Sequence, residues 1–215
     1  MPVVPPKPAN ISMLKRLALA VIVLLGLAQV WDHFTHRAIA RPDGVLVATE
    51  PQQTEVEDAG PFAFREFTLM PLAKFSLHGR VLLASRYRLG REAALAPYDL
   101  GIGWQRMSDS AVLRGLSLSQ SARFLHWRWR DVPPIPEAEI TRSAANIHLI
   151  PASRSIEKRI AALRPGQLVS LQGRLVEASR PDGWRWRSSL SRGDSGNGAC
   201  ELLYVEAIDE DSGAG

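Results

Sequence analysis

The sequence predicts an α+β protein in which one N-terminal transmembrane helix precedes a body made mainly of antiparallel strands with short helices. Three observations lead to this prediction. An almost unbroken apolar run occupies residues 17–31. Alternating apolar residues, which are typical of half-buried strands, recur from residue 62 onward. Helical periodicity is confined to short stretches such as 153–163.

The apolar run reads LALAVIVLLGLAQVW, and only Gln29 interrupts it. Its strict core is shorter than the roughly 20 residues that span a bilayer. Lysine and arginine stems can extend toward the headgroups, so residues 11–31 are long enough for a membrane anchor. Two alternatives stay open, a signal peptide cleaved after Ala28 and a buried core helix.

Basic residues on the N-terminal side of the run indicate its orientation. Three precede it: Lys7, Lys15 and Arg16. This bias favours a cytoplasmic N-terminus. We therefore expect a single-pass inner-membrane (cell-membrane) protein with a periplasmic body, and membrane lipid as a partner of the helix.

The anchor divides the chain into five segments. The predicted segments are a disordered cytoplasmic tail (1–10), the anchor (11–31), a juxtamembrane collar and acidic linker (32–61), the extracytoplasmic body (62–208) and a disordered tail (209–215). About 150 residues beyond the anchor and linker are enough for one domain with its own core.

Composition narrows the possible functions. The net charge is +4, from 26 basic and 22 acidic residues, which is a weak indication of an anionic partner. Together with the extracytoplasmic location, it does not favour nucleic acid. The single cysteine, Cys200, excludes an internal disulfide, and we expect it to be a small buried apolar residue and not a nucleophile.

The first half of the body shows mostly strand patterns. Alternation predicts strands over 62–69 and 75–89, with Gly79 at a bulge or tight bend. Gly101 and Gly103 make residues 97–107 look like a loop. Ser108 is a predicted cap for a short helix, and 122–131 is a predicted strand.

The second half alternates short helices and strands. Predicted elements are a helix over 136–145, a strand over 146–150, a helix capped by Ser153 or Ser155, a hairpin of 167–178 with 183–190, and a final strand over 200–208. Two internal similarities stand out. SLHGRVLLASR (76–86) resembles SLQGRLVEASR (170–180), and WRWR occurs at 127–130 and 184–187.

The two WRWR segments are the best binding candidates. On a strand, their tryptophans lie on one face and their arginines on the other. The tryptophans either line the core beside a solvated arginine face, or stack on sugars or bases, while the arginines grip an anionic ligand. The candidate residues are Trp127, Arg128, Arg130, Trp184, Arg185, Trp186 and Arg187.

Asn146 and His148 are a second candidate site because they share one face of a predicted strand. They either bind a ligand or satisfy buried backbone groups. A hydrolase would use His148 with Asp109 or Asp194. The GDSG sequence at 193–196 does not indicate a chymotrypsin-like protease, since His148 lies too few residues upstream. No histidine or cysteine spacing typical of a metal site, and no cofactor motif, is present.

Three segments resemble uncharacterised, membrane-anchored proteins of Gram-negative bacteria: DLGIGWQRMSD (99–109), SAANIHLIPA (143–152) and WRSSLSRGDSGNGACE (186–201). The resemblance implies an envelope location and no particular activity. Separately, PGQLVSLQGRLVEA (165–178) is similar to the first strand of small OB-like barrels. It implies such a barrel at the C-terminal end.

These observations predict a periplasmic binding or accessory domain that functions by contact with an envelope protein partner. No catalytic residue is assigned. Two alternatives remain, a membrane-tethered hydrolase and an OB-like module for nucleic acid or another anionic ligand.

Overall fold

The computed structural model describes residues 15–23, 26, 37–57, 59–191 and 200–211. The chain separates into two compact units, residues 1–37 and 38–215. In the first unit, residues 15–23 are helical and exposed. No helix within the described part of the chain is both long and apolar enough to cross a membrane. The expected anchor over 11–31 lies largely outside the described residues.

The second unit, called the body below, is a mixed α+β structure of mostly strands with a few short helices. Its strands are β1 (Gln52–Glu55), β2 (Phe62–Phe64), β3 (Phe67–Arg86), β4 (Tyr98–Gly103), β5 (Ser117–Ser121), β6 (Phe124–Arg128), β7 (Ala144–Pro151), β8 (Leu168–Ser179), β9 (Arg185–Arg187) and β10 (Glu201–Glu210). Its helices are α2 (Arg91–Leu95), the 3₁₀ helix η1 (Gln105–Ser108), α3 (Ser110–Arg114), α4 (Glu137–Ser143) and α5 (Arg154–Ala161).

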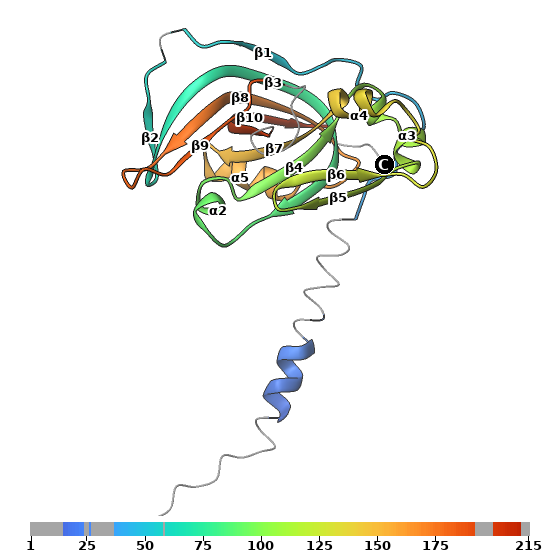
Figure 1. Cartoon of the computed structure of the whole chain (residues 1–215). Helices are drawn as coiled ribbons and strands as arrows, with labels where there is room; N and C mark the ends of the chain where they lie inside the picture. Colours follow the sequence, from blue (N-terminus) through green and yellow to red (C-terminus); the bar gives the residue numbers. More distant parts are fainter. Residues whose placement is uncertain (1–14, 24–25, 27–36, 58, 192–199, 212–215) are drawn as a thin grey trace, which may run out of the picture. The chain divides into compact units, whose positions relative to one another are not determined.

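Five strands form a closed ring. β3 is long and strongly curved (Figure 1), and it pairs antiparallel with β8 over 68–80 and with β4 over 80–86. β4 pairs antiparallel with β7, β7 pairs parallel with β10, and β10 pairs antiparallel with β8. The order around the ring is therefore β3-β4-β7-β10-β8 and back to β3.

The interior of the ring is the main core. Each ring strand contributes fully buried apolar side chains, among them Leu77, Leu100, Ile147, Leu171 and Leu203. Helix α5 adds Ile160 to the same cluster, followed by Leu163. Burial in β3 alternates along residues 67–77, as the period of two in its sequence predicts.

The similar segments 76–86 and 170–180 turn out to be neighbours. Leu77 pairs with Leu171 and His78 with Ser170 in the β3–β8 ladder. Gly79 lies against the side chain of Ile102, and Gly173 lies against the backbone of Tyr204, so neither position has room for a Cβ atom. Each glycine therefore permits a close approach between strands. The segment similar to a first barrel strand, 165–178, forms most of β8, the fourth ring strand in chain order.

Residues 38–57 are part of the body, although the sequence predicts a juxtamembrane collar and acidic linker over 32–61. Val47 is buried, the Ser108 hydroxyl accepts hydrogen bonds of 3.0 Å from the amides of Leu46 and Val47, and β1 pairs with β3. The acidic composition does not predict this strand, because the side chains of β1 are all exposed and only its backbone is paired.

Two other predicted elements differ from the structure. Residues 98–103, which look like a loop, form β4 with every residue buried. Its glycines are needed because Gly101 faces Leu125 and Gly103 faces the Met107 backbone. The predicted strand over 122–131 is shorter, because the chain turns at Ala122 and Arg123 and forms the β5–β6 hairpin. Helices α4 and α5 and the β8–β9 hairpin agree with the prediction.

Candidate functional site

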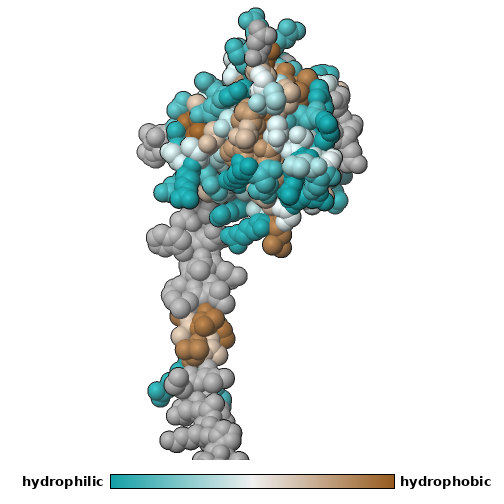
Figure 2. Space-filling model, turned by 90° about the vertical axis from the view of Figure 1, so that its left-hand side faces the viewer, coloured by the Kyte–Doolittle hydropathy of each residue, from teal (hydrophilic) through white to brown (hydrophobic). Residues whose placement is uncertain are grey.

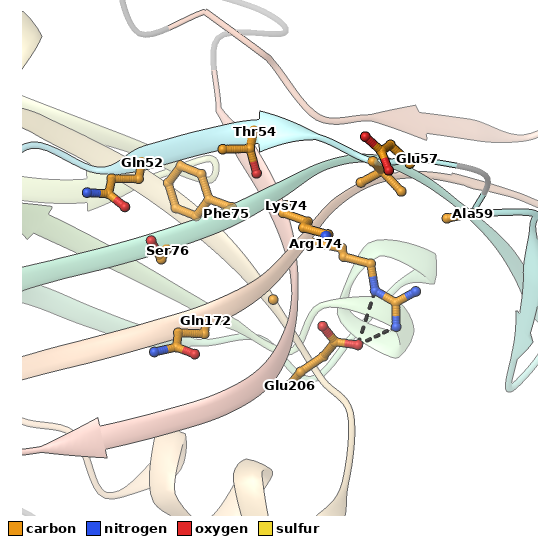
Figure 3. Close-up of a pocket in the computed structure, with 12 residues that line it drawn as sticks. Gln52, Thr54, Glu57, Ala59, Lys74, Phe75, Ser76, Gln172, Arg174 and Glu206 are labelled. Carbon is orange, nitrogen blue, oxygen red and sulfur yellow. Dashed lines mark hydrogen bonds and ion pairs between the residues drawn. The ribbon is translucent and has the colours of Figure 1, made fainter.

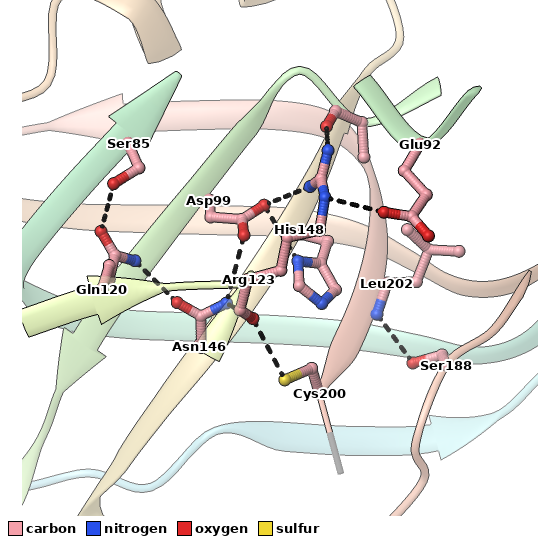
Figure 4. Close-up of polar contacts among 11 residues, drawn as sticks. Ser85, Glu92, Asp99, Gln120, Arg123, Asn146, His148, Ser188, Cys200 and Leu202 are labelled. Atoms are coloured by element: carbon pink, nitrogen blue, oxygen red, sulfur yellow. Dashed lines mark hydrogen bonds and ion pairs between the residues drawn. The ribbon is translucent and has the colours of Figure 1, made fainter. Parts of the chain in front are cut away.

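A buried polar cluster lies on the outer face of β4 and β7 (Figure 4). Asp99 on β4 pairs with His148 on β7, and Gly101 pairs with Asn146. Alternate residues of a strand share a face, so Asn146 and His148 lie on one face of β7, as their spacing predicts. Asp99 lies beside them on the neighbouring strand. All three residues are buried, and the Asp99 side chain is completely inaccessible.

The Asp99 carboxylate is the centre of this cluster. Its Oδ1 accepts hydrogen bonds from Arg123 Nη1 at 2.8 Å and from His148 Nδ1 at 2.9 Å, and its Oδ2 accepts one from Asn146 Nδ2 at 3.4 Å. Because the carboxylate accepts a hydrogen bond from His148 Nδ1, the proton of the neutral imidazole lies on that nitrogen. A buried charge needs such partners, because without them its desolvation costs several kcal/mol, on the order of 3–5.

Arg123 reaches the cluster from the tip of the β5–β6 hairpin. Ala122 and Arg123 both have positive φ, 48° and 66°, as the two central residues of a type I′ hairpin turn require. Non-glycine residues adopt this conformation at a cost of about 1 kcal/mol or more each. The contacts of Arg123 offset that cost.

The guanidinium of Arg123 is held on every side. Its Nε lies 3.3 Å from Glu92, its Nη2 donates to the Ala96 carbonyl at 3.2 Å, and its Cζ lies 4.1 Å from the Tyr87 ring centroid and 5.3 Å from that of Trp186. Such stacking of a guanidinium on aromatic rings is favourable. Burial and the Asp99 charge raise the pKa of Tyr87 above its ordinary value.

Amide side chains extend the cluster beneath the hairpin. Gln120 Nε2 donates to Asn146 Oδ1 at 2.6 Å, and Ser85 donates to Gln120 Oε1 at 2.9 Å. Asn146 Nδ2 also donates to the Arg123 carbonyl at 2.8 Å. The hairpin is thus fastened to β4 and β7 by side chains of both strands, and it covers their outer face.

Cys200 borders this cluster but is not activated. Its Sγ lies 3.7 Å from the Arg123 carbonyl, to which it donates. Burial, followed by the charges of Glu201 and Asp99, raises the pKa of the thiol to about 12. A thiol with such a pKa stays protonated at neutral pH and is a poor nucleophile.

The first WRWR segment lies on the hairpin and beyond it. Trp127 and Trp129 pack on the apolar cluster under the hairpin, beside Leu82 and Met107. Arg128 and Arg130 are exposed, and neither forms an ion pair within the described residues. Leu125, between Arg123 and Trp127, fills the space that Gly101 leaves on β4.

The second WRWR segment consists of Trp184 and the three residues of β9 that follow it. Trp184 and Trp186 pack inward against an apolar cluster that includes Phe67 and Val176, and Trp186 lies 4.8 Å from the His148 ring. The exposed arginines of β9 bind Glu177 on β8, Arg185 at 2.8 Å and Arg187 at 2.5 Å. These bonds, first that of Arg187, lower the pKa of Glu177.

An open groove lies elsewhere on the ring, over the outer faces of β1, β3, β8 and β10 (Figure 3). It has a volume of about 510 Å³. The lining residues are Gln52, Thr54, Val56, Glu57, Ala59, Lys74, Phe75, Ser76, Gln172, Gly173, Arg174 and Glu206. A hollow of about 230 Å³ shares Gln52, Ser76 and Gln172 with it and adds His78 and Ser170.

Strand register arranges the polar side chains of the groove in rows. Gln52, Ser76 and Gln172 are consecutive partners across β1, β3 and β8. The next row is Thr54, Lys74 and Arg174. Since cross-strand partners have Cβ atoms about 5 Å apart, the side chains of each row are neighbours in the groove.

No pattern in the sequence identifies Asp99, Arg123 or the groove residues as parts of a site. Asp99 lies in the glycine-interrupted stretch, and Arg123 lies inside a predicted strand. Of the residues proposed for a hydrolase, Asp109 instead caps α3 by accepting from the Ala111 amide at 2.8 Å, and Asp194 lies outside the described residues. Among the residues that the structure describes, no three histidine, cysteine or acidic side chains are grouped for a metal ion.

Comparison with known proteins yields no match to a family model, a curated protein or a solved structure. The surface of the body is mainly hydrophilic on the side shown in Figure 2, with limited hydrophobic patches. Among the described residues of the body, the exposed large apolar side chains are separated in sequence: Val45, Met70, Leu89, Val132 and Leu190. The groove and the buried cluster are therefore the two candidate sites.

Proposed function

We propose that the chain is a membrane-tethered, extracytoplasmic module with an OB-like ring, and that it works by binding an envelope component in the open groove. The observation that carries the proposal is the groove itself, to which four strands contribute hydrogen-bonding side chains. Ligand sites are typically concave and offer a few convergent polar groups.

The strand order supports the OB-like part. The ring has five strands, the third and fifth in chain order are parallel, and α5 connects the third to the fourth. OB-type barrels are five-stranded and usually bind ligands on the face of their second and third strands. In this chain those strands are β4 and β7, whose outer face is covered by the β5–β6 hairpin. The face of β1, β3 and β8 remains open for a ligand.

The anchor rests on the sequence. The apolar run 17–31 and the preceding basic residues favour a helix with its N-terminus in the cytoplasm. The body then lies in the periplasm. Protease added to intact spheroplasts tests this location: the body should be digested, and a body that resists digestion until the cells are lysed contradicts it.

Binding is tested with the full-length chain in mild detergent. We expect retention on isolated cell-wall polymer or lipopolysaccharide, and loss of retention in the double variant Gln52→Ala, Gln172→Ala. The matched control is Gln53→Ala, since Gln53 lies on the opposite face of β1 and outside the groove lining. Equal retention of the double variant and the control would rule out the groove as the binding site.

A hydrolase is the second candidate, and the Asp99–His148 pair favours it. An aspartate that accepts from Nδ1 orients a histidine so that Nε2 can exchange a proton with a substrate. Against it, the His148 side chain is only 4% exposed. Turnover of ester, phosphate or glycan substrates that disappears in His148→Gln would establish this candidate, and absence of turnover would reject it.

Charge compensation weighs against the nucleic-acid alternative. Arginines on and beside β8 and β9 already have carboxylate partners: Arg174 with Glu206, Arg180 with Glu66, and both Arg185 and Arg187 with Glu177. Binding to a phosphate backbone depends on arginines and lysines that can replace counterions. We expect no steeply salt-dependent binding to oligonucleotides.

A further inference from the structure

We infer that the groove binds an oligosaccharide that carries carboxylate groups, and that Lys74 recognises the carboxylate. The inference rests on the proposed binding function and specifies its ligand class. Three features of the groove carry it: hydrogen-bonding side chains without internal partners, one cation without a counter-charge, and a neighbouring cation that is fixed in place.

The first feature is the set of free polar side chains. Gln52, Thr54, Ser76 and Gln172 line the groove, and none of their side chains hydrogen-bonds with any residue in the described part of the chain. Amides and hydroxyls both donate and accept. Sugar hydroxyls have the same double capacity, so successive rows of such side chains suit a chain of sugar units.

The second feature is Lys74. It lies in the middle of the groove floor, between Thr54 and Arg174 in the cross-strand row. It is exposed, and its ammonium group has no ion-pair partner among the described residues. A ligand carboxylate would supply the missing counter-charge and form a charge-assisted hydrogen bond.

The third feature is the adjacent pair of Arg174 and Glu206. Arg174 donates to Glu206 through Nε at 3.1 Å and through Nη2. Its guanidinium also lies 5.1 Å from the Phe62 ring centroid and 5.8 Å from that of Tyr204. Arg174 is thus neutralised and held in place, so Lys74 is the free cation of this row.

The charges of the groove restrict where a ligand carboxylate can lie. Glu206 is paired with Arg174, whereas Glu57 also lines the groove and forms no ion pair among the described residues, so a ligand anion is favoured opposite Lys74 and opposed near Glu57. A uronic-acid oligosaccharide can place one carboxylate at Lys74 and its neutral hydroxyls along the free polar side chains. A polyphosphate has no such hydroxyls.

The experiment titrates the full-length protein in detergent, by calorimetry, with four probes: hexagalacturonate, maltohexaose, hexaglutamate and inorganic phosphate. Hexagalacturonate should bind most tightly. Lys74→Gln should weaken that binding by about 10-fold, as expected for loss of a hydrogen bond to a charged group, and leave maltohexaose unchanged. The control is Lys158→Gln, an exposed lysine on α5, which should behave like the parent protein.

Several outcomes overturn the inference. It fails if Lys74→Gln binds hexagalacturonate as well as the control does, if hexaglutamate or phosphate binds equally well, or if none of the probes binds. If maltohexaose matches hexagalacturonate and Gln172→Ala weakens both, the groove binds by contact but does not select carboxylates. In that case the proposed function stands and the present inference is rejected.

Discussion

Arg123 donates a 2.8 Å hydrogen bond to Asp99, a fully buried carboxylate 24 positions earlier in the chain. The pair joins the tip of the β5–β6 hairpin to the ring strand β4. It therefore holds the hairpin over the outer face of β4 and β7. The open groove lies on another part of the ring, over β1, β3, β8 and β10.

Replacing Arg123 tests how strongly the hairpin is held. Arg123→Ala leaves Asp99 buried with one strong donor fewer, so the free energy of unfolding should fall by about 3 kcal/mol. Arg123→Lys should recover only part of the loss, because an ammonium group cannot reproduce the planar, stacked guanidinium. Urea unfolding followed by tryptophan fluorescence measures both changes.

The control for Arg123 is Arg128 on the same hairpin. It is exposed and forms no ion pair with the described residues, so Arg128→Ala should change the free energy of unfolding by less than about 0.5 kcal/mol. Similar losses of unfolding free energy in Arg123→Ala and Arg128→Ala would mean that the buried Arg123–Asp99 pair stabilises the fold no more than an exposed arginine does.

Gly173→Ala tests the closeness of β8 and β10. A Cβ atom at residue 173 would overlap the Tyr204 carbonyl group, so the strands must separate at a cost of about 2–3 kcal/mol. Thermal unfolding of the variant measures this cost. Gly60→Ala is the matched control, since nothing lies within 4 Å of its Cβ position, and it should be neutral. An unchanged melting temperature for Gly173→Ala would contradict the close packing.

The strand-rich α+β class of the body was predictable because its main signals are local. Alternation over β3 and the Pro-Asp-Gly turn before β9 depend on neighbouring residues, and both appear in the structure. The similar sequences 76–86 and 170–180 also have a physical reason, since two curved, directly paired strands place similar demands on their residues.

The site was less predictable because its contacts are long-range. Gly101 and Gly103 look like loop residues until the chain that presses against them, Leu125 and Met107, is known. Asp99 and Arg123 meet only because the ring and the hairpin bring them together. Residues 42–61 have the acidic, aperiodic composition of a linker, and nothing in that composition reveals that β1 pairs with β3.

Cys200 should be almost unreactive in the folded protein. Burial raises the pKa of its thiol from 9.0 to about 12, so the thiolate fraction at pH 8 should be about 1000-fold lower than for an ordinary thiol. Alkylation by iodoacetamide should be correspondingly slow, and fast in urea. Because the thiol holds its proton more strongly in the folded state than in the unfolded state, the free energy of unfolding is unaffected by this group below pH 9. It falls as the pH rises from 9 toward 12. Fast alkylation of the native protein would show that the thiol is accessible and not shifted.

Glu177 should contribute to stability in a pH-dependent way. Arg187 and Arg185 lower its pKa below the ordinary 4.5, so its contribution is complete above pH 4.5 and is lost as the pH falls through the lowered value. Because both arginines are exposed, Glu177→Gln should cost at most about 1 kcal/mol at pH 7. The difference from the parent protein should vanish in strong acid, which urea unfolding at a series of pH values can measure. The control is Glu55→Gln on the exposed β1, which should change the free energy of unfolding at pH 7 by less than about 0.5 kcal/mol. A Glu177→Gln penalty that persists in strong acid would mean that the lost interaction is not ionic.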